Sequence, residues 1–128
     1  MANRLMVVDD DEAFCLYVDS LARKHGWECR ICTDSTTIER VLGEYAPDLL
    51  MLHIVMPGRD GIELVAHLTG LPKDTRILFV SASRSDYLSY ARAISETRLE
   101  RPVETRMKPL RPDDFAELLN GTRMDADR

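Results

Sequence analysis

The sequence predicts an α/β protein in which helices cover both faces of a parallel sheet. Short apolar segments of the 128-residue chain alternate with segments of helical periodicity, and the apolar segments are nearly continuous in hydrophobic residues. Strands of a parallel sheet show this pattern because both of their faces are buried. The chain has no internal repeats or linkers, so we expect one domain over residues 1–121 and a polar tail over residues 122–128.

Five apolar runs are expected to form the strands. They are residues 4–8, 27–32, 49–53, 76–80 and 102–107. The last run is the least apolar, and it is placed by the regular alternation of strands and helices.

The segments between these strands carry apolar residues at helical spacing. The expected helices are residues 12–25, a segment that ends by residue 46, and residues 61–71, 85–96 and 111–120. Asp34 or Ser35 can cap the second helix, and the proline after Ala46 disfavours helical conformation in that residue. Gly26 and Gly121 are suited to ending the first and last helices.

The composition argues against several classes of partner. The chain has a net charge of -5, and its basic residues are scattered, which disfavours direct binding to nucleic acid or to a membrane surface. It contains no apolar run long enough to span a bilayer, and its N-terminus becomes acidic too early for a signal peptide. We therefore expect a cytoplasmic protein.

Three cysteines agree with a reducing compartment. Cys29 and Cys32 have the spacing of some metal or redox pairs, but they lie in an expected strand. Side chains three residues apart on a strand point to opposite faces, so these two sulfurs should not share an ion. We interpret Cys15, Cys29 and Cys32 as packing residues.

Polar residues lie where four of the expected strands end. In open parallel sheets, functional sites form outside the carboxyl ends of the strands. The residues at these ends are Asp9 and Asp10, His53, Ser81 and Lys108.

Four motifs at these strand ends resemble the receiver domains of two-component response regulators. They are VVDDDE at residues 7–12, PDLLMLHIVMPGRDGIEL at 47–64, VSAS at 80–83 and MKPL at 107–110. The resemblance covers nearly the whole chain. It implies a flavodoxin-like, doubly wound sheet with the strand order 2-1-3-4-5.

The resemblance also implies the role of each residue. In the family, an aspartate that ends the third strand accepts a phosphoryl group. Asp9, Asp10 and the backbone carbonyl of Val55 would hold Mg²⁺, which prefers hard oxygen ligands. Ser81 and Lys108 would contact the phosphoryl group, and the bond between Lys108 and Pro109 is expected to be cis.

The sequence departs from the family at the phosphoacceptor, where it has His53 in place of aspartate. A misalignment does not explain this, because Asp48 begins the strand and Asp60 already lies at the next helix. A histidine buried in the core is one alternative, and an engineered Asp-to-His variant of an ordinary response regulator is another. A second departure is Thr105, which stands where receivers often carry a switching aromatic residue.

These departures predict a receiver that is not an enzyme and acts by protein contacts, with phosphorylation lost or not needed. The expected partner is a sensor histidine kinase or a downstream output protein. Mg²⁺ should bind weakly or not at all, and a positive His53 ring could replace part of its charge. The alternative is retained chemistry in the cleft, either phosphorylation of His53 or binding of a softer divalent metal such as zinc, nickel or manganese.

Overall fold

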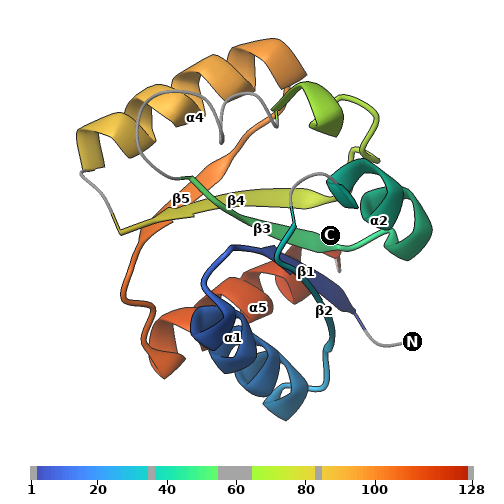
Figure 1. Ribbon diagram of the computed structural model, residues 1–128, viewed down its shortest axis with the longest axis vertical. Coiled ribbons are helices and arrows are strands. Elements are labelled where there is room, and N and C mark those ends of the chain that lie inside the picture. The colour runs from blue at the N-terminus through green and yellow to red at the C-terminus, as the bar shows by residue number, and fades with distance from the viewer. Residues whose placement is uncertain (1–2, 35–36, 55–64, 83–84, 127–128) are drawn as a thin grey trace.

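Five parallel strands form one sheet at the centre of the protein (Figure 1). The computed structural model describes residues 3–34, 37–54, 65–82 and 85–126, and their side chains except in 85–87 and 122–126. The strands are β1 (Arg4–Val8), β2 (Glu28–Cys32), β3 (Leu49–His53), β4 (Arg76–Ser81) and β5 (Glu104–Met107). Their order is β2-β1-β3-β4-β5, and every neighbouring pair is parallel. The expected fold class and strand order are therefore confirmed.

Helices cover both faces of this sheet, as the nearly continuous apolar strands predict. They are α1 (Glu12–Lys24), α2 (Ile38–Tyr45), the short 3-10 helix η2 (Val65–Leu68), α4 (Ser85–Leu99) and α5 (Pro112–Ala126). α1 and α5 lie on one face, and α2, η2 and α4 lie on the other (Figure 1). Within the described ranges, no helix is both long enough and apolar enough to cross a membrane.

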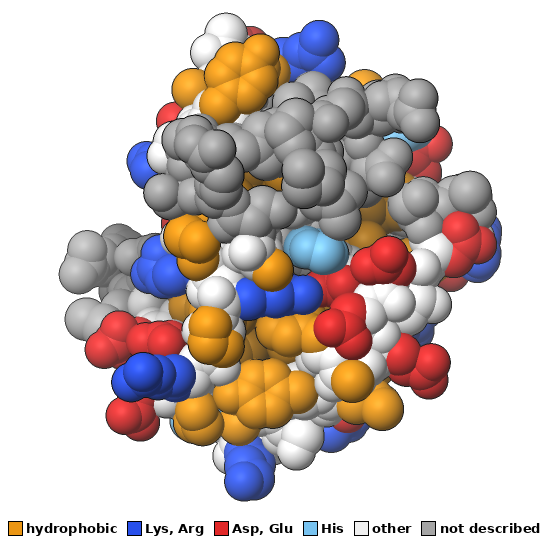
Figure 2. All heavy atoms as spheres, turned by 60° about the vertical axis from the view of Figure 1, so that its left-hand side comes forward, with side chains coloured by type: hydrophobic (Ala, Val, Ile, Leu, Met, Phe, Trp, Pro, Cys, Tyr) orange, Lys and Arg blue, Asp and Glu red, His pale blue; other side chains and the backbone are white. Residues whose placement is uncertain are grey.

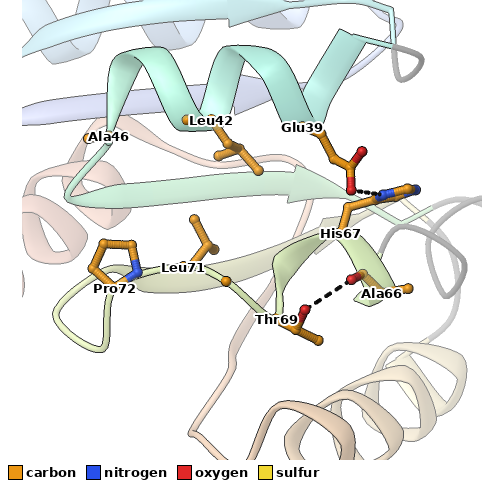
Figure 3. A pocket seen from close by; sticks show the side chains of 10 residues that line it. Glu39, Leu42, Ala46, Ala66, His67, Thr69, Leu71 and Pro72 are labelled. Carbon is orange, nitrogen blue, oxygen red and sulfur yellow. Dashed lines mark hydrogen bonds and ion pairs between the residues drawn. The ribbon is translucent and has the colours of Figure 1, made fainter.

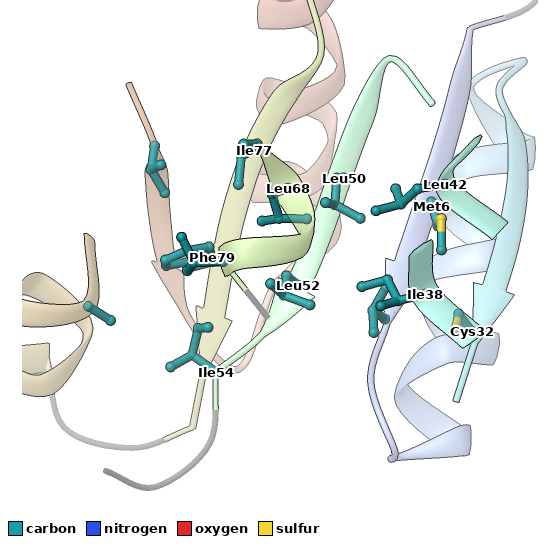
Figure 4. Packing of buried hydrophobic residues seen from close by; sticks show 14 of the residues in the cluster. Met6, Cys32, Ile38, Leu42, Leu50, Leu52, Ile54, Leu68, Ile77 and Phe79 are labelled. Carbon is teal, nitrogen blue, oxygen red and sulfur yellow. The ribbon is translucent and has the colours of Figure 1, made fainter. Parts of the chain in front are cut away.

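The sheet divides the apolar core into two clusters because successive side chains of a strand point to opposite faces. Leu50 and Leu52 of β3 pack on the side of α2, η2 and α4 (Figure 4). Leu49 and Met51 pack on the side of α1 and α5. All four are at most 1% exposed, and burial of one such side chain contributes about 2 kcal/mol.

Both ends of α1 follow from the local sequence. The Asp11 carboxylate accepts a hydrogen bond of 3.2 Å from the backbone N–H of Phe14, which caps the start of the helix. At the other end Gly26 has φ +81°, a left-handed conformation that glycine adopts without strain. The N–H of Trp27 then donates to the Ala22 carbonyl at 3.0 Å. The expected stop at Gly26 is confirmed.

The second helix begins later than a cap at Asp34 would place it. Thr37 precedes α2, and its side chain makes no capping hydrogen bond to the helix. The hydroxyl and the backbone N–H of Thr37 both donate to the Asp34 carbonyl, at 3.0 and 3.3 Å. These two hydrogen bonds join Asp34 to Thr37, so the helix begins after Thr37. Ser35, the other expected cap, lies outside the described residues.

The expected end of the last helix is also wrong, because α5 continues past Gly121 to Ala126. Gly121 does not have the left-handed conformation that would end a helix. A glycine inside a helix costs only about 1 kcal/mol relative to alanine, so the neighbouring helical contacts decide the outcome. The first residues of the expected tail therefore belong to α5.

The remaining boundaries differ by a few residues from the expected ones. β2 begins at Glu28 and β5 at Glu104, each later than expected, and α4 extends to Leu99. Of the expected helix over residues 61–71, the structure describes residues 65–71, and only η2 is helical there. Residues 55–64, which include the expected start of that helix, lie outside the described residues.

Candidate functional site

The carboxyl ends of four strands bring polar residues together at one edge of the sheet. The register pairs the last residue of β1 with Leu52, so Asp9 comes next to His53 at the end of β3. Ser81 ends β4, and Lys108 directly follows β5. The strands are parallel, so these ends project at the same edge.

Asp9 is the centre of this group. Its side chain has no exposed surface, and each carboxylate oxygen has a partner. Oδ1 lies 3.0 Å from Nδ1 of His53 and accepts a hydrogen bond of 2.9 Å from the backbone N–H of Asp11. Oδ2 accepts a hydrogen bond of 2.9 Å from Nζ of Lys108. A buried carboxylate with three donors around it is well stabilised in its charged form.

The pKa of Asp9 reflects these opposing influences. Burial raises the pKa, because it disfavours the charged carboxylate. The hydrogen bonds from His53, the Asp11 backbone and Lys108 lower it, and together they outweigh burial. The pKa of Asp9 therefore lies well below that of an ordinary aspartate, and the carboxylate stays ionised at neutral pH.

Lys108 is held from two further directions. Its Nζ lies 4.0 Å from the ring centroid of Phe14, a residue of α1, which is a favourable cation-π contact. Its backbone N–H donates to the Ser81 carbonyl at 2.9 Å, which extends the pairing of β4 and β5. The peptide bond between Lys108 and Pro109 is cis, as expected. The ammonium group is thus fixed beside Asp9.

Asp10 and Ser81 occupy different positions relative to Asp9. The Asp10 side chain is 81% exposed, and its Oδ1 lies 3.8 Å from Nδ1 of His53. Ser81 is fully buried at the end of β4. Val55, the expected carbonyl ligand, lies outside the described residues. His53, whose side chain is 15% exposed, therefore stands between a buried and an exposed carboxylate rather than in the apolar core.

The donor set fits Mg²⁺ poorly. Mg²⁺ takes about six oxygen ligands in a near-ideal octahedron. One oxygen of Asp9 already accepts from Lys108, and the residue at the end of β3 offers an imidazole nitrogen in place of a carboxylate. Among the described residues, the group able to hold a metal is Asp9, Asp10 and His53, with one ligand atom from each within 4.8 Å of the others.

Sequence reasoning missed two residues that support Asp9. It did not foresee the contact of Phe14 with Lys108. It assigned Cys15 to packing, and this thiol also donates to the Asp9 carbonyl at 3.3 Å. Burial and the nearby charges of Asp9 and Asp11 raise the pKa of Cys15 to about 11. The helical periodicity of the residues after Asp11 predicts on which side of α1 Phe14 and Cys15 lie, but it does not predict which residues they contact.

Among the described residues, one hollow adjoins the ionised centre and another lies between two helices. The first borders Lys108 and is mostly apolar; it is lined by Ala13, Phe14, Tyr17, Ala82, Lys108, Pro109 and Leu110. Figure 2 shows histidine, acidic and basic side chains meeting beside hydrophobic ones on this side of the molecule. The second hollow lies between α2 and η2, where His67 Nδ1 is 2.7 Å from Glu39 Oε1 (Figure 3).

Known proteins share this sequence pattern. The profile of the response regulator receiver domain matches residues 5–119. The Regulator of RpoS from Escherichia coli (strain K12) is 26% identical over 106 residues, which are 81% of this chain and 32% of that protein. Response regulator MprA from Mycobacterium tuberculosis (strain ATCC 25177 / H37Ra) is 29% identical over an alignment 133 residues long, gaps included, which covers 91% of this chain and 56% of that protein.

Solved structures share the fold. A receiver domain protein (CheY-like) from Methanospirillum hungatei JF-1 superimposes with a TM-score of 0.82, at 20% identity, and the match covers 99% of this chain and 98% of that one. At this identity the likeness concerns the fold. The chain spans 32% to 56% of the length of the two curated relatives, so the activities of those whole proteins are not carried over with it.

Proposed function

The chain belongs to the response regulator receiver domain family, and from that membership we propose that it is a receiver whose phosphoacceptor position is held by His53. In this proposal the domain acts through contacts with other proteins and forms no aspartyl phosphate. It is not an enzyme. It works in the cytoplasm, with a sensor histidine kinase or a downstream output protein as its partner and without direct contact to nucleic acid or membrane.

The observation that carries the proposal is the imidazole at the end of β3. An acyl phosphate forms on a carboxylate, and His53 has none. Among the described residues, the carboxylate in contact with Nδ1 of His53 at 3.0 Å is that of Asp9, which is buried and engaged by Lys108 and His53 on different oxygens. Such a carboxylate is a poor nucleophile, because its charge is already neutralised by hydrogen bonds.

Phosphorylation of the ring itself is disfavoured at Nδ1. At 3.0 Å from a carboxylate oxygen, Nδ1 carries a hydrogen and donates it. A nitrogen that donates a hydrogen bond has no lone pair to offer a phosphoryl group. This contact argues against phosphorylation at Nδ1 and leaves Nε2 as the ring nitrogen at which a phosphoryl adduct has to be sought.

Weak binding of Mg²⁺ is part of the same proposal. The expected ligand set loses one hard oxygen at His53, and Lys108 brings a positive charge to the other oxygen of Asp9. The hypothesis that a positive His53 ring replaces part of the ion's charge stays a prediction. It requires hydrogens on both ring nitrogens in the metal-free protein, which the ¹⁵N chemical shifts of the ring report.

Mass spectrometry after incubation with a small phosphodonor and Mg²⁺ tests the proposal. The unchanged protein should gain no phosphoryl mass, whereas His53→Asp should gain one group, because Asp9, Asp10, Ser81 and Lys108 remain around the new carboxylate. His53→Asn is the matched control, since it removes the imidazole without adding a carboxylate, and it should gain none.

The chemistry of any adduct decides the outcome. An acyl phosphate is lost in alkali and reduced by borohydride. If the unchanged protein forms such an adduct on a carboxylate of the cleft, such as Asp9 or Asp10, the proposal is wrong. If His53→Asp folds and gains no mass, then the surrounding residues do not form a working receiver cleft.

A further inference from the structure

We propose that Asp9, Asp10 and His53 form a binding site for a late transition-metal dication, such as Zn²⁺, Ni²⁺ or Co²⁺, in preference to Mg²⁺. This inference deepens the proposed function and rests on it in one respect, the presence of His53 at the acceptor position. It concerns what the altered cleft binds, which the loss of phosphorylation does not determine.

The spacing of the donor atoms fits one small ion. Zinc binds nitrogen and oxygen at about 2.0–2.2 Å, so two ligands on adjacent corners of its coordination shell lie about 3–3.5 Å apart. Nδ1 of His53 is 3.0 Å from Asp9 Oδ1 and 3.8 Å from Asp10 Oδ1. These two distances lie close to that range, so small side-chain rotations would complete the site.

The chemistry of the donors favours a metal that accepts nitrogen. Imidazole is a common ligand of Zn²⁺, Cu²⁺ and Ni²⁺, whereas Mg²⁺ is bound almost entirely by oxygen. The affinity of a mixed nitrogen and oxygen site rises from manganese through cobalt and nickel toward copper. Replacing a carboxylate by His53 therefore moves the selectivity of the cleft away from magnesium.

The surroundings help to orient the ligands of the ion. Lys108 donates to Oδ2 of Asp9, so Oδ1 is the oxygen directed toward His53. The backbone N–H of Asp11 also holds Oδ1, at 2.9 Å, which fixes the carboxylate as a supporting shell would. Asp10 is exposed, so water can fill the remaining coordination positions. On binding, the ion takes the place of the hydrogen on Nδ1: a neutral ring then carries its hydrogen on Nε2, whereas a charged ring keeps the Nε2 hydrogen and releases one proton to solvent.

Isothermal titration of the full chain with each metal salt tests this proposal. Zn²⁺ should bind at least about tenfold more tightly than Mg²⁺, and His53→Ala should weaken Zn²⁺ binding by about tenfold or more. His67→Ala is the matched control, because His67 also pairs with a carboxylate, Glu39, at 2.7 Å but belongs to no group of three ligands among the residues that the structure describes. That variant should leave the affinity unchanged.

Two further variants keep the proposal testable if His53→Ala does not fold. Asp10→Asn changes an exposed side chain and should also weaken Zn²⁺ binding, while His53→Asp should shift the preference toward Mg²⁺. Co²⁺ adds an optical readout, since its visible absorption reports nitrogen and oxygen ligation in the unchanged protein.

The results separate this proposal from the proposed function. Equal affinity for Mg²⁺ and Zn²⁺, or equal losses in His53→Ala and His67→Ala, would overturn the metal site. Neither result bears on phosphoryl uptake. Uptake by the unchanged protein would refute the proposed function even if His53 binds Zn²⁺ as expected.

Discussion

At the scale of single residues, Asp9 is the side chain on which the site depends. It follows β1 in full burial, and it joins three other segments through Lys108, His53 and the backbone of Asp11. A buried carboxylate without these donors would be strongly destabilising. The three contacts therefore have a structural role whether or not the cleft binds an ion.

The first prediction at this scale concerns acid stability. Asp9 has a folded pKa below its unfolded value, so the unfolded chain binds more protons as the pH falls. The contribution of Asp9 is complete above about pH 4 and is lost as the pH falls further. Asp9→Asn should lower the free energy of unfolding by about 2 kcal/mol at neutral pH, because it leaves Lys108 without its carboxylate partner.

Urea unfolding followed by circular dichroism measures this effect across the acid range. The difference between the unchanged protein and Asp9→Asn should shrink as the pH falls below about 4. Asp10→Asn is the control, because that side chain is 81% exposed, and its effect on stability should be small at any pH. A difference that stays constant down to the lowest accessible pH would contradict the assigned role of Asp9.

At the scale of elements, the glycines of α1 and α5 have opposite roles. Gly26 ends α1 in a left-handed conformation, with φ +81°. Gly121 lies inside α5, which continues to Ala126. A Cβ added at Gly121 would meet the Arg76 guanidinium at 3.6 Å, an ordinary van der Waals distance. Glycine therefore ends α1, whereas inside α5 it only lowers the stability of the helix.

This contrast predicts opposite effects of the same substitution. Gly121→Ala should raise the free energy of unfolding by about 0.5–1 kcal/mol, because alanine favours a helix interior. Gly26→Ala should lower it by about 1 kcal/mol, because a side chain is strained at positive φ. Thermal unfolding of both variants provides the measurement. A loss of stability in Gly121→Ala would show that α5 does not continue through this position.

At the scale of the whole molecule, titratable groups are buried on both faces of the sheet. Cys15 lies in the cluster of α1 and α5, and Tyr45 lies in the opposite cluster. Burial raises the pKa of Cys15 to about 11 and that of Tyr45 to about 12. Burial and the nearby charge of Asp19 raise the pKa of Cys29 to about 12. Folding therefore keeps these groups neutral in both halves of the core.

These pKa shifts predict a loss of stability at alkaline pH. The unfolded chain releases thiol protons near pH 9, while the folded chain holds them until a higher pH, so the unfolded state binds fewer protons in that window. The free energy of unfolding should fall as the pH rises above about 9. Urea unfolding under reducing conditions measures it, and Cys29→Ala should lose less stability over the same range. Equal stability at about pH 8 and 10 would contradict this prediction.

From the sequence alone, the alternating strands and helices and the polar residues that follow four strands could be predicted. The alternation of apolar runs and helical segments gave the α/β class, and the motifs at the strand ends gave the receiver fold and its strand order through resemblance. Gly26 was assigned correctly because its neighbours require a turn there. Asp9, Asp10, His53, Ser81 and Lys108 were found because parallel strands direct their carboxyl ends to one edge.

The contacts between these residues follow from long-range packing, which the sequence pattern does not reveal. The register of three strands decides which oxygen of Asp9 faces His53 and which faces Lys108. No local sequence pattern encodes this arrangement. The contact of Phe14 with Lys108 joins residues that are far apart in the chain. The continuation of α5 past Gly121 depends on helical contacts that outweigh a cost of about 1 kcal/mol. Local sequence sets the identity of the groups, and long-range packing sets the distances on which their chemistry depends.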